Sequence, residues 1–332
     1  MVSCVHGRGY GDAGTLVYQL SHRVTGAVRL LAAFSITALF ACNNGSSPPP
    51  SGESGDFAGR VALPNGRVLY LECRGEGRPT VILESGLRNR ADIWRVAGND
   101  DVSPDAVFPK LAVFTRVCAY DRPGTTLGTD QFSRSDAVPM PRRAADAVDD
   151  LHQLLAAARV PGPYVMVGHS TGGLIARLYA ASYPDQVVGL VLVDAIAETM
   201  QTLLTPEQWA QYNGLLLVAP PPELASYRDL ETIDFDVSFA QMRAAAVARP
   251  LRPLPFAVLS KGQRFALPSD LPPGLGDAVE RAWQASQDWL AGLLPDTRNV
   301  VVADSSHYIQ VERPQVVIDA VEQVVAAVRD SE

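Results

Sequence analysis

The sequence has little positive charge and almost no lysine. It contains 28 Lys and Arg residues against 36 Asp and Glu residues, which gives a formal net charge of −8 at pH 7. Only Lys110 and Lys261 are lysines, and no basic stripe occurs along the chain. Because nucleic-acid binding relies on clustered cations that neutralise phosphates, we expect no nucleic-acid partner.

Motifs for cofactors are also missing. The 332 residues include five histidines and four cysteines, and these form no cluster with metal-ligand spacing. No glycine-rich dinucleotide fingerprint follows a predicted strand. We therefore expect neither a metal ion nor an organic cofactor, which leaves the chemistry to the side chains themselves.

A long apolar run is absent too. The stretch RLLAAFSITALFAC, residues 29–42, is too short to cross a bilayer core of about 30 Å. Its end, LFAC, resembles a bacterial lipobox. We expect residues 1–41 to be a lipoprotein-type signal peptide for export to the bacterial cell envelope, with Cys42 lipidated as a membrane anchor. Cleavage without lipidation, giving a periplasmic or secreted protein, and an apolar helix packed on the domain remain open alternatives.

The remaining sequence has the pattern of a linker and one α/β domain. Residues 42–58 are rich in Gly, Ser and Pro, which predicts a flexible tether. Over residues 59–332, short β-branched runs alternate with amphipathic stretches, as in a mostly parallel sheet covered on both faces. An excursion at about 196–252 interrupts this alternation and predicts a helical cap, whose apolar side chains either line a cavity or pack on the body.

One motif in this alternation carries a specific chemical hypothesis. The sequence YVMVGHSTGGLIARLYAASYP places Ser170 between a predicted strand and a predicted helix, with Gly168 and Gly172 on either side. Such glycines allow the strand and the helix to approach closely around a strained turn. The beginning of the helix also directs backbone N–H groups at negative charge beside the serine. Ser170 is therefore the candidate nucleophile.

A serine nucleophile needs a general base, and few histidines are available. His169 adjoins the serine and should point elsewhere from such a turn, and His152 lies on the preceding helix, where a surface or packing role is expected. His307, in VVADSSHYIQVERP, follows the last predicted strand. Sites gather at this edge of a parallel sheet, so His307 is the candidate base.

Several motifs together resemble the α/β-hydrolase superfamily: GHSTGG, YDRPG after the fourth strand, LVLVDA after the next helix, and SSHYIQVERPQVV around His307. The resemblance runs from about Gly59 to the C-terminus. It implies a mostly parallel eight-stranded sheet with helices on both faces and a cap between strands six and seven. It also implies the chain order serine, acid, histidine.

The resemblance leaves the acid of a catalytic triad open between two positions. Some members carry it after strand six, where this chain has Asp194, and others after strand seven, where Asp270 is the first carboxylate. We favour Asp194, with Asp304 as a weaker third candidate. The oxyanion hole is expected to use the backbone N–H groups of Thr171 and Leu87.

The same resemblance bears on two further pairs of residues. Cys73 and Cys118 end up in neighbouring strands if the second and fourth strands pair, which favours a disulfide in an exported protein over two buried thiols. Asp121 and Arg122 of the YDRPG motif are expected to be structural, paired with each other or with their surroundings.

The predicted activity is hydrolysis of carboxylic esters through an acyl-enzyme on Ser170, with His307 as general base and Asp194 as the orienting acid. A small-molecule ester is the expected partner, and the sequence does not define the oligomeric state. Thioester, lactone or amide hydrolysis by the same mechanism is an alternative. A non-catalytic protein of this fold that binds a ligand is the alternative from a different class.

Overall fold

The computed structural model describes residues 55–331 except for 101, 218–223, 225–226 and 228. The expected signal peptide, Cys42 and most of the expected linker lie outside these residues. The first strand begins at Phe57, two residues before the expected start of the domain. No helix in the described part of the chain is both long enough and apolar enough to span a membrane.

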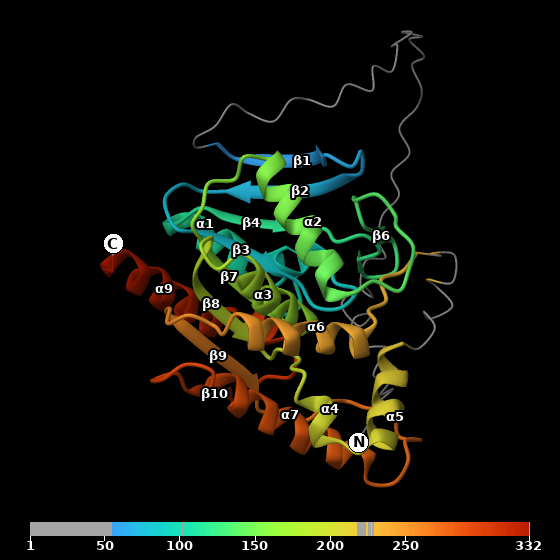
Figure 1. The fold of residues 1–332 in the computed structure, drawn as a ribbon. Coiled ribbons are helices and arrows are strands. Elements are labelled where there is room, and N and C mark those ends of the chain that lie inside the picture. The colour runs from blue at the N-terminus through green and yellow to red at the C-terminus, as the bar shows by residue number, and fades with distance from the viewer. Residues whose placement is uncertain (1–54, 101, 218–223, 225–226, 228, 332) are drawn as a thin grey trace, which may run out of the picture.

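The core of the molecule is an eight-stranded sheet, whose strands follow one another in Figure 1 from β1 at the top to β10 at the bottom. The first two pairings in the sheet order are antiparallel and the others are parallel. The predicted mostly parallel sheet is thus confirmed, with a mixed edge. In spatial order the strands are β1 (Phe57–Ala62), β2 (Val68–Arg74), β4 (Val117–Tyr120), β3 (Thr80–Glu84), β7 (Tyr164–His169), β8 (Val187–Val193), β9 (Phe256–Lys261) and β10 (Asn299–Val302).

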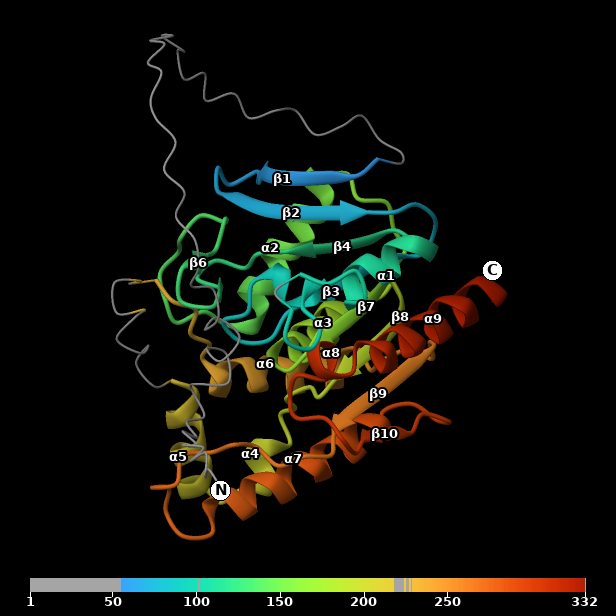
Figure 2. The same cartoon turned by 180° about the vertical axis from the view of Figure 1, so that it is seen from behind.

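Helices cover both faces of the sheet, as the sequence pattern predicts. On one face lie α2 (Ala144–Ala157), α3 (Thr171–Ser182) and α7 (Leu275–Ala291), and Figure 2 shows α1 (Val107–Phe114) and α9 (Pro314–Asp330) on the other. Each face has its own cluster of buried apolar side chains. The central strands β3, β4 and β7 are buried along their whole length, which explains their continuous apolar sequences.

The chain between β8 and β9 leaves the sheet and forms α4 (Met200–Leu203), α5 (Pro206–Leu216) and α6 (Phe235–Ala248). Its helix starts are encoded locally. The Thr205 hydroxyl accepts the Gln208 N–H, Gln208 bonds back to the Thr205 N–H, and Asp234 caps α6. This is the predicted helical cap between the sixth and seventh strands of the sheet.

Three further features complete the fold. Cys73 and Cys118 face each other in the antiparallel register of β2 and β4, and the structure joins them in a disulfide. The helix α7 is not among the segments that the sequence pattern singles out, although Val279, Trp283 and Leu290 form a helical apolar stripe. A small second sheet pairs β5 (Thr126–Leu127) with β6 (Gln131–Phe132).

Candidate active site

Ser170 lies on the sharp turn between β7 and α3. Its backbone has φ 53° and ψ −122°, in a region that residues with a side chain rarely adopt. Hydrogen bonds hold this conformation, because the Ser170 N–H donates to the Val193 carbonyl and the Ser170 carbonyl accepts from the Ile196 N–H. Such strain persists only where the surrounding structure enforces it, and it concentrates at functional sites.

The glycines around Ser170 are required by close backbone contacts. A Cβ atom at Gly168 would lie 2.5 Å from the Gly172 carbonyl oxygen, and one at Gly172 would lie 2.3 Å from the Glu84 carbonyl oxygen. No side chain fits at either position without moving the backbone. The spacing of the motif is therefore explained by the approach of α3 to the strands β7 and β3.

His307 and the buried Asp194 form a hydrogen-bonded pair beside this turn. His307 lies on the loop between β10 and α8 (Ile309–Glu312), and Asp194 directly follows β8. The His307 Nδ1 lies 2.6 Å from the Asp194 Oδ2. The other carboxylate oxygen, Oδ1, accepts the Trp283 Nε1–H at 2.9 Å and the Lys261 N–H at 3.1 Å. Asp194 is fully buried, so these three donors compensate for the loss of water.

The other carboxylates considered as the acid lie elsewhere. Asp270 is exposed on the chain after β9, and Asp304 is exposed and paired with Arg313. The geometry thus brings His307 together with Asp194 alone among the three candidates. His152 packs by stacking on Tyr183, with ring centroids 3.8 Å apart.

His169 supports the loop that carries His307. Its ring is completely buried, and its Nε2 lies 2.9 Å from the His307 carbonyl oxygen, so a neutral ring donates there. Burial, followed by the nearby His307, lowers the pKa of His169 well below its ordinary value. His169 therefore stays uncharged and acts as a fixed hydrogen-bond donor, a role that no sequence pattern indicates.

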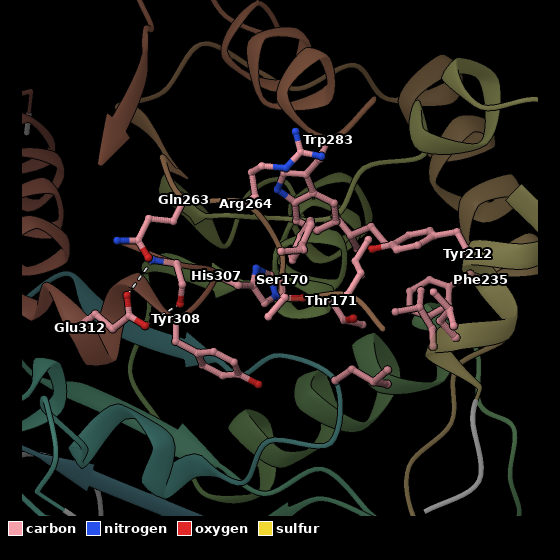
Figure 3. A pocket seen from close by; sticks show the side chains of 18 residues that line it. Ser170, Thr171, Tyr212, Phe235, Gln263, Arg264, Trp283, His307, Tyr308 and Glu312 are labelled. Atoms are coloured by element: carbon pink, nitrogen blue, oxygen red, sulfur yellow. Dashed lines mark hydrogen bonds between the residues drawn. The ribbon is translucent and has the colours of Figure 1, made fainter. Parts of the chain in front are cut away.

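Ser170 and His307 line one cavity of about 430 Å³ beneath the cap (Figure 3). This volume is within the usual range for small-molecule sites. Most of its wall is apolar, and the apolar part comes from five parts of the chain: the loop after β3, the cap, the chain after β9, α7 and the loop after β10. The apolar and aromatic residues of the wall are Leu87, Ile196, Tyr212, Leu215, Leu216, Phe235, Phe265, Ala266, Leu267, Trp283 and Tyr308.

Leu87 and Thr171, the two residues expected to supply the N–H groups of an oxyanion hole, both line the same cavity. Thr171 is the first residue of α3, and the first N–H groups of a helix have no partner within the helix. In the described residues, no group of three or more His, Cys, Asp or Glu side chains could hold a metal ion.

Asp121 and Arg122 do not form an ion pair with each other. Asp121 accepts from Arg134 and from the Ala91 N–H, whereas Arg122 is buried between Glu84 and Glu231. Burial raises the pKa of Glu84, although Arg122 acts in the opposite direction. Both residues of the motif thus bind their surroundings, which was one of the two expectations.

Comparison with known proteins finds relatives that match parts of this chain. The pimeloyl-[acyl-carrier protein] methyl ester esterase of Chromobacterium violaceum is 29% identical over 216 residues, which are 64% of this chain and 71% of the esterase. An uncharacterized Schizosaccharomyces pombe protein is 31% identical over 153 residues, 41% of this chain, and the chain spans only 27% of that relative's length.

Among solved structures, a thermophilic esterase from Thermogutta terrifontis shares the fold, with a TM-score of 0.53 and 20% identity. The match covers 82% of this chain and 99% of that esterase. The model of the alpha/beta hydrolase family matches residues 81–320, which is most of the sequence. The protein therefore belongs to the alpha/beta hydrolase family, as the sequence motifs predict.

Proposed function

We propose that the protein is a serine hydrolase that cleaves carboxylic esters through an acyl-enzyme on Ser170. The observation that carries the proposal is that two of three features line one cavity and the third is bonded to one of them. These are a serine on a strained turn at the start of a helix, a histidine on a neighbouring loop, and a buried carboxylate 2.6 Å from that histidine.

In the proposed first step, the Ser170 Oγ attacks the ester carbonyl carbon while His307 Nε2 takes the serine proton. The Asp194 carboxylate holds the Nδ1–H of His307 and stabilises the imidazolium that forms. The N–H groups of Leu87 and Thr171 stabilise the negative oxygen of the tetrahedral intermediate. When the intermediate collapses, His307 returns the proton to the departing alcohol.

Water completes the reaction. His307 takes a proton from a water molecule, whose oxygen attacks the acyl carbon on Ser170. The second tetrahedral intermediate then collapses, the carboxylic acid leaves, and the proton passes from His307 to the Ser170 Oγ. The enzyme returns to its starting state, and no cofactor is consumed.

The wall of the cavity consists mostly of apolar side chains, which favours substrates with an apolar acyl or alcohol group. The Chromobacterium relative is named as a methyl ester esterase, which agrees with ester cleavage. Thioesters, lactones and amides remain alternative substrates. We also retain as proposals the signal peptide over 1–41, lipidation at Cys42 and residence at the cell envelope. Mass spectrometry of the N-terminus of the protein from cell membranes tests these three.

The test of the function is hydrolysis of p-nitrophenyl esters of increasing acyl length, with Ser170→Ala and His307→Ala measured beside the wild type. Both variants should lose turnover while they keep the wild-type unfolding temperature. Labelling by a fluorophosphonate should occur in the wild type and vanish in Ser170→Ala. A folded wild type inert to every ester and to the fluorophosphonate would instead favour the ligand-binding protein.

A further inference from the structure

The loop that carries Leu87 is held from behind by the buried guanidinium of Arg122. This group donates to the Ser85 carbonyl oxygen at 2.8 Å and to the Gly86 carbonyl oxygen at 2.7 Å. The Gly86 oxygen also accepts the Asn89 N–H at 3.1 Å. Because a peptide unit is planar and trans, fixing the Gly86 carbonyl also fixes the N–H of Leu87, which points the opposite way.

Arg122 is in turn held by two buried carboxylates. It donates to Glu84 at 2.5 Å and forms a two-pronged pair with Glu231, with Nε to Oε1 at 2.6 Å and Nη2 to Oε2 at 2.9 Å. Together with the two carbonyls, these bonds use all five N–H groups of the guanidinium. Burial alone would lower the pKa of Arg122, but Glu231 and Glu84 raise it above its ordinary value.

Glu231 also holds the other side of Leu87. Its Oε2 accepts the Arg88 N–H at 2.7 Å, and this N–H belongs to the peptide unit that follows Leu87. Arg88 has φ 63°, a left-handed conformation that is unfavourable for an arginine and persists through such contacts. Both peptide units that flank Leu87 therefore depend on one carboxylate, directly or through Arg122.

Glu231 does not come from the sheet. It lies in the insertion between β8 and β9, just before α6, and it is 1% exposed. We propose that Glu231 is a positioning residue of the cap that orients the Leu87 N–H for the oxyanion, and so couples the seating of the cap to the rate of the chemical step. This inference rests on the proposed function, since it concerns the same reaction.

The effect should fall on the transition state rather than on substrate binding. An oxyanion donor contributes most when the carbonyl oxygen becomes charged, so misorientation lowers kcat more than it changes KM. In Glu231→Gln, the amide nitrogen is a donor and must face an N–H of Arg122 or Arg88. We expect kcat to fall at least ten-fold while KM stays within three-fold of the wild type.

A matched control exists in the same insertion. Glu198 forms a buried two-pronged pair with Arg177 at 2.8 and 2.9 Å, and neither side chain lines the cavity. Glu198→Gln removes a comparable buried charge and should lower the unfolding temperature. It should leave kcat within two-fold of the wild type.

The experiment measures KM and kcat, with kcat expressed per active site and the active sites counted by fluorophosphonate titration. It also measures inhibition by a trifluoromethyl ketone, whose adduct with the serine mimics the tetrahedral intermediate. Affinity for the ketone should fall in Glu231→Gln in parallel with kcat and stay unchanged in Glu198→Gln. If Glu231→Gln does not fold, Glu231→Asp decides by the same criteria, because the shorter side chain cannot reach both partners.

Three results would overturn the inference. They are a kcat within two-fold of the wild type in the folded Glu231 variant, an unchanged affinity for the ketone, or an equal loss of kcat in Glu198→Gln. An active wild type with any of these results refutes only the role of Glu231. A wild type inert to esters and to the fluorophosphonate overturns the proposed function, and the inference with it.

Discussion

Replacing Asp194 with asparagine tests the central pair of the site with minimal change in shape. The Oδ1 of Asp194 accepts hydrogen bonds from Lys261 and Trp283, so an asparagine must keep its oxygen there. Its amide nitrogen then faces His307, where Asp194 places Oδ2. A donor in this position pairs only with an unprotonated Nδ1, which moves the imidazole proton to Nε2. His307 can then no longer accept the proton of Ser170.

The magnitude follows from this change of tautomer. Loss of the correct tautomer in a serine triad lowers kcat by about 10⁴. At about 1.36 kcal/mol per factor of ten, the barrier rises by roughly 5.4 kcal/mol. The assay is p-nitrophenyl ester hydrolysis near pH 7.5, with the unfolding temperature recorded to show that Asp194→Asn is folded. Asparagine tolerates the positive φ of 43° at this position, which favours folding.

Asp270→Asn is the control, because Asp270 is exposed and should be replaceable with less than a two-fold change in kcat. The reasoning is refuted if folded Asp194→Asn keeps more than a tenth of the wild-type kcat. It is also refuted if Asp270→Asn loses activity by orders of magnitude, because the acid would then be the carboxylate after β9.

Three other predictions concern the cavity, the disulfide and the buried histidine. Leu215→Trp should fill part of the cavity and shift the preferred substrate to esters with a shorter acyl chain. In the wild type, each methylene group that the cavity accommodates should raise kcat/KM up to about four-fold, because burial of a CH₂ group contributes ~0.8 kcal/mol. An unchanged length profile would contradict the assignment of the wall. Removing the bond between Cys73 and Cys118, 45 residues apart, with a double alanine variant should lower the free energy of unfolding by about 4 kcal/mol in urea titrations, with kcat unchanged. His169 has a lowered pKa in the folded protein, so its contribution to stability is fully present above its unfolded pKa of about 6.5. As the pH falls below this value, the unfolded chain binds a proton that the folded protein does not bind. The free energy of unfolding then decreases by up to ~1.4 kcal/mol per pH unit. His169→Gln should flatten this part of the stability profile between pH 6.5 and 5, and an unchanged slope would argue against a neutral buried ring.

The parts of the fold and site that the sequence predicts are those encoded by neighbouring residues. Ser170 is recognisable because the strand, the two glycines and the helix around it are continuous in the chain. The alternation of β-branched runs and amphipathic stretches predicts the sheet for the same reason. His307 required the additional rule that sites gather at one edge of a parallel sheet, and Asp194 required the resemblance to the α/β-hydrolase superfamily. Their roles stay predictions until the variants are measured.

The residues that sequence reasoning missed act across long distances in the chain. Trp283, on α7, donates a hydrogen bond to Asp194. The apolar residues of α7 have helical spacing in the sequence, but this spacing indicates only that the helix packs on the body. Glu231 stands in the polar sequence RDLETIDF, where nothing distinguishes a buried carboxylate from an exposed one. The role of His169 depends on a loop that starts more than a hundred positions later. Only the assembled structure reveals such partners.

The arrangement of the site also governs when activity can arise as the chain folds. Asp194 and His307 are 113 residues apart, and the loop of His307 is placed only after β9 and β10 have joined the sheet. Contacts of such long sequence separation form slowly, whereas helices form early. During refolding, the circular dichroism of the helices should therefore return before any ester is cleaved. Ester hydrolysis would therefore show whether the last third of the chain has packed onto the sheet. A partly folded molecule that is rich in helix would give no hydrolysis.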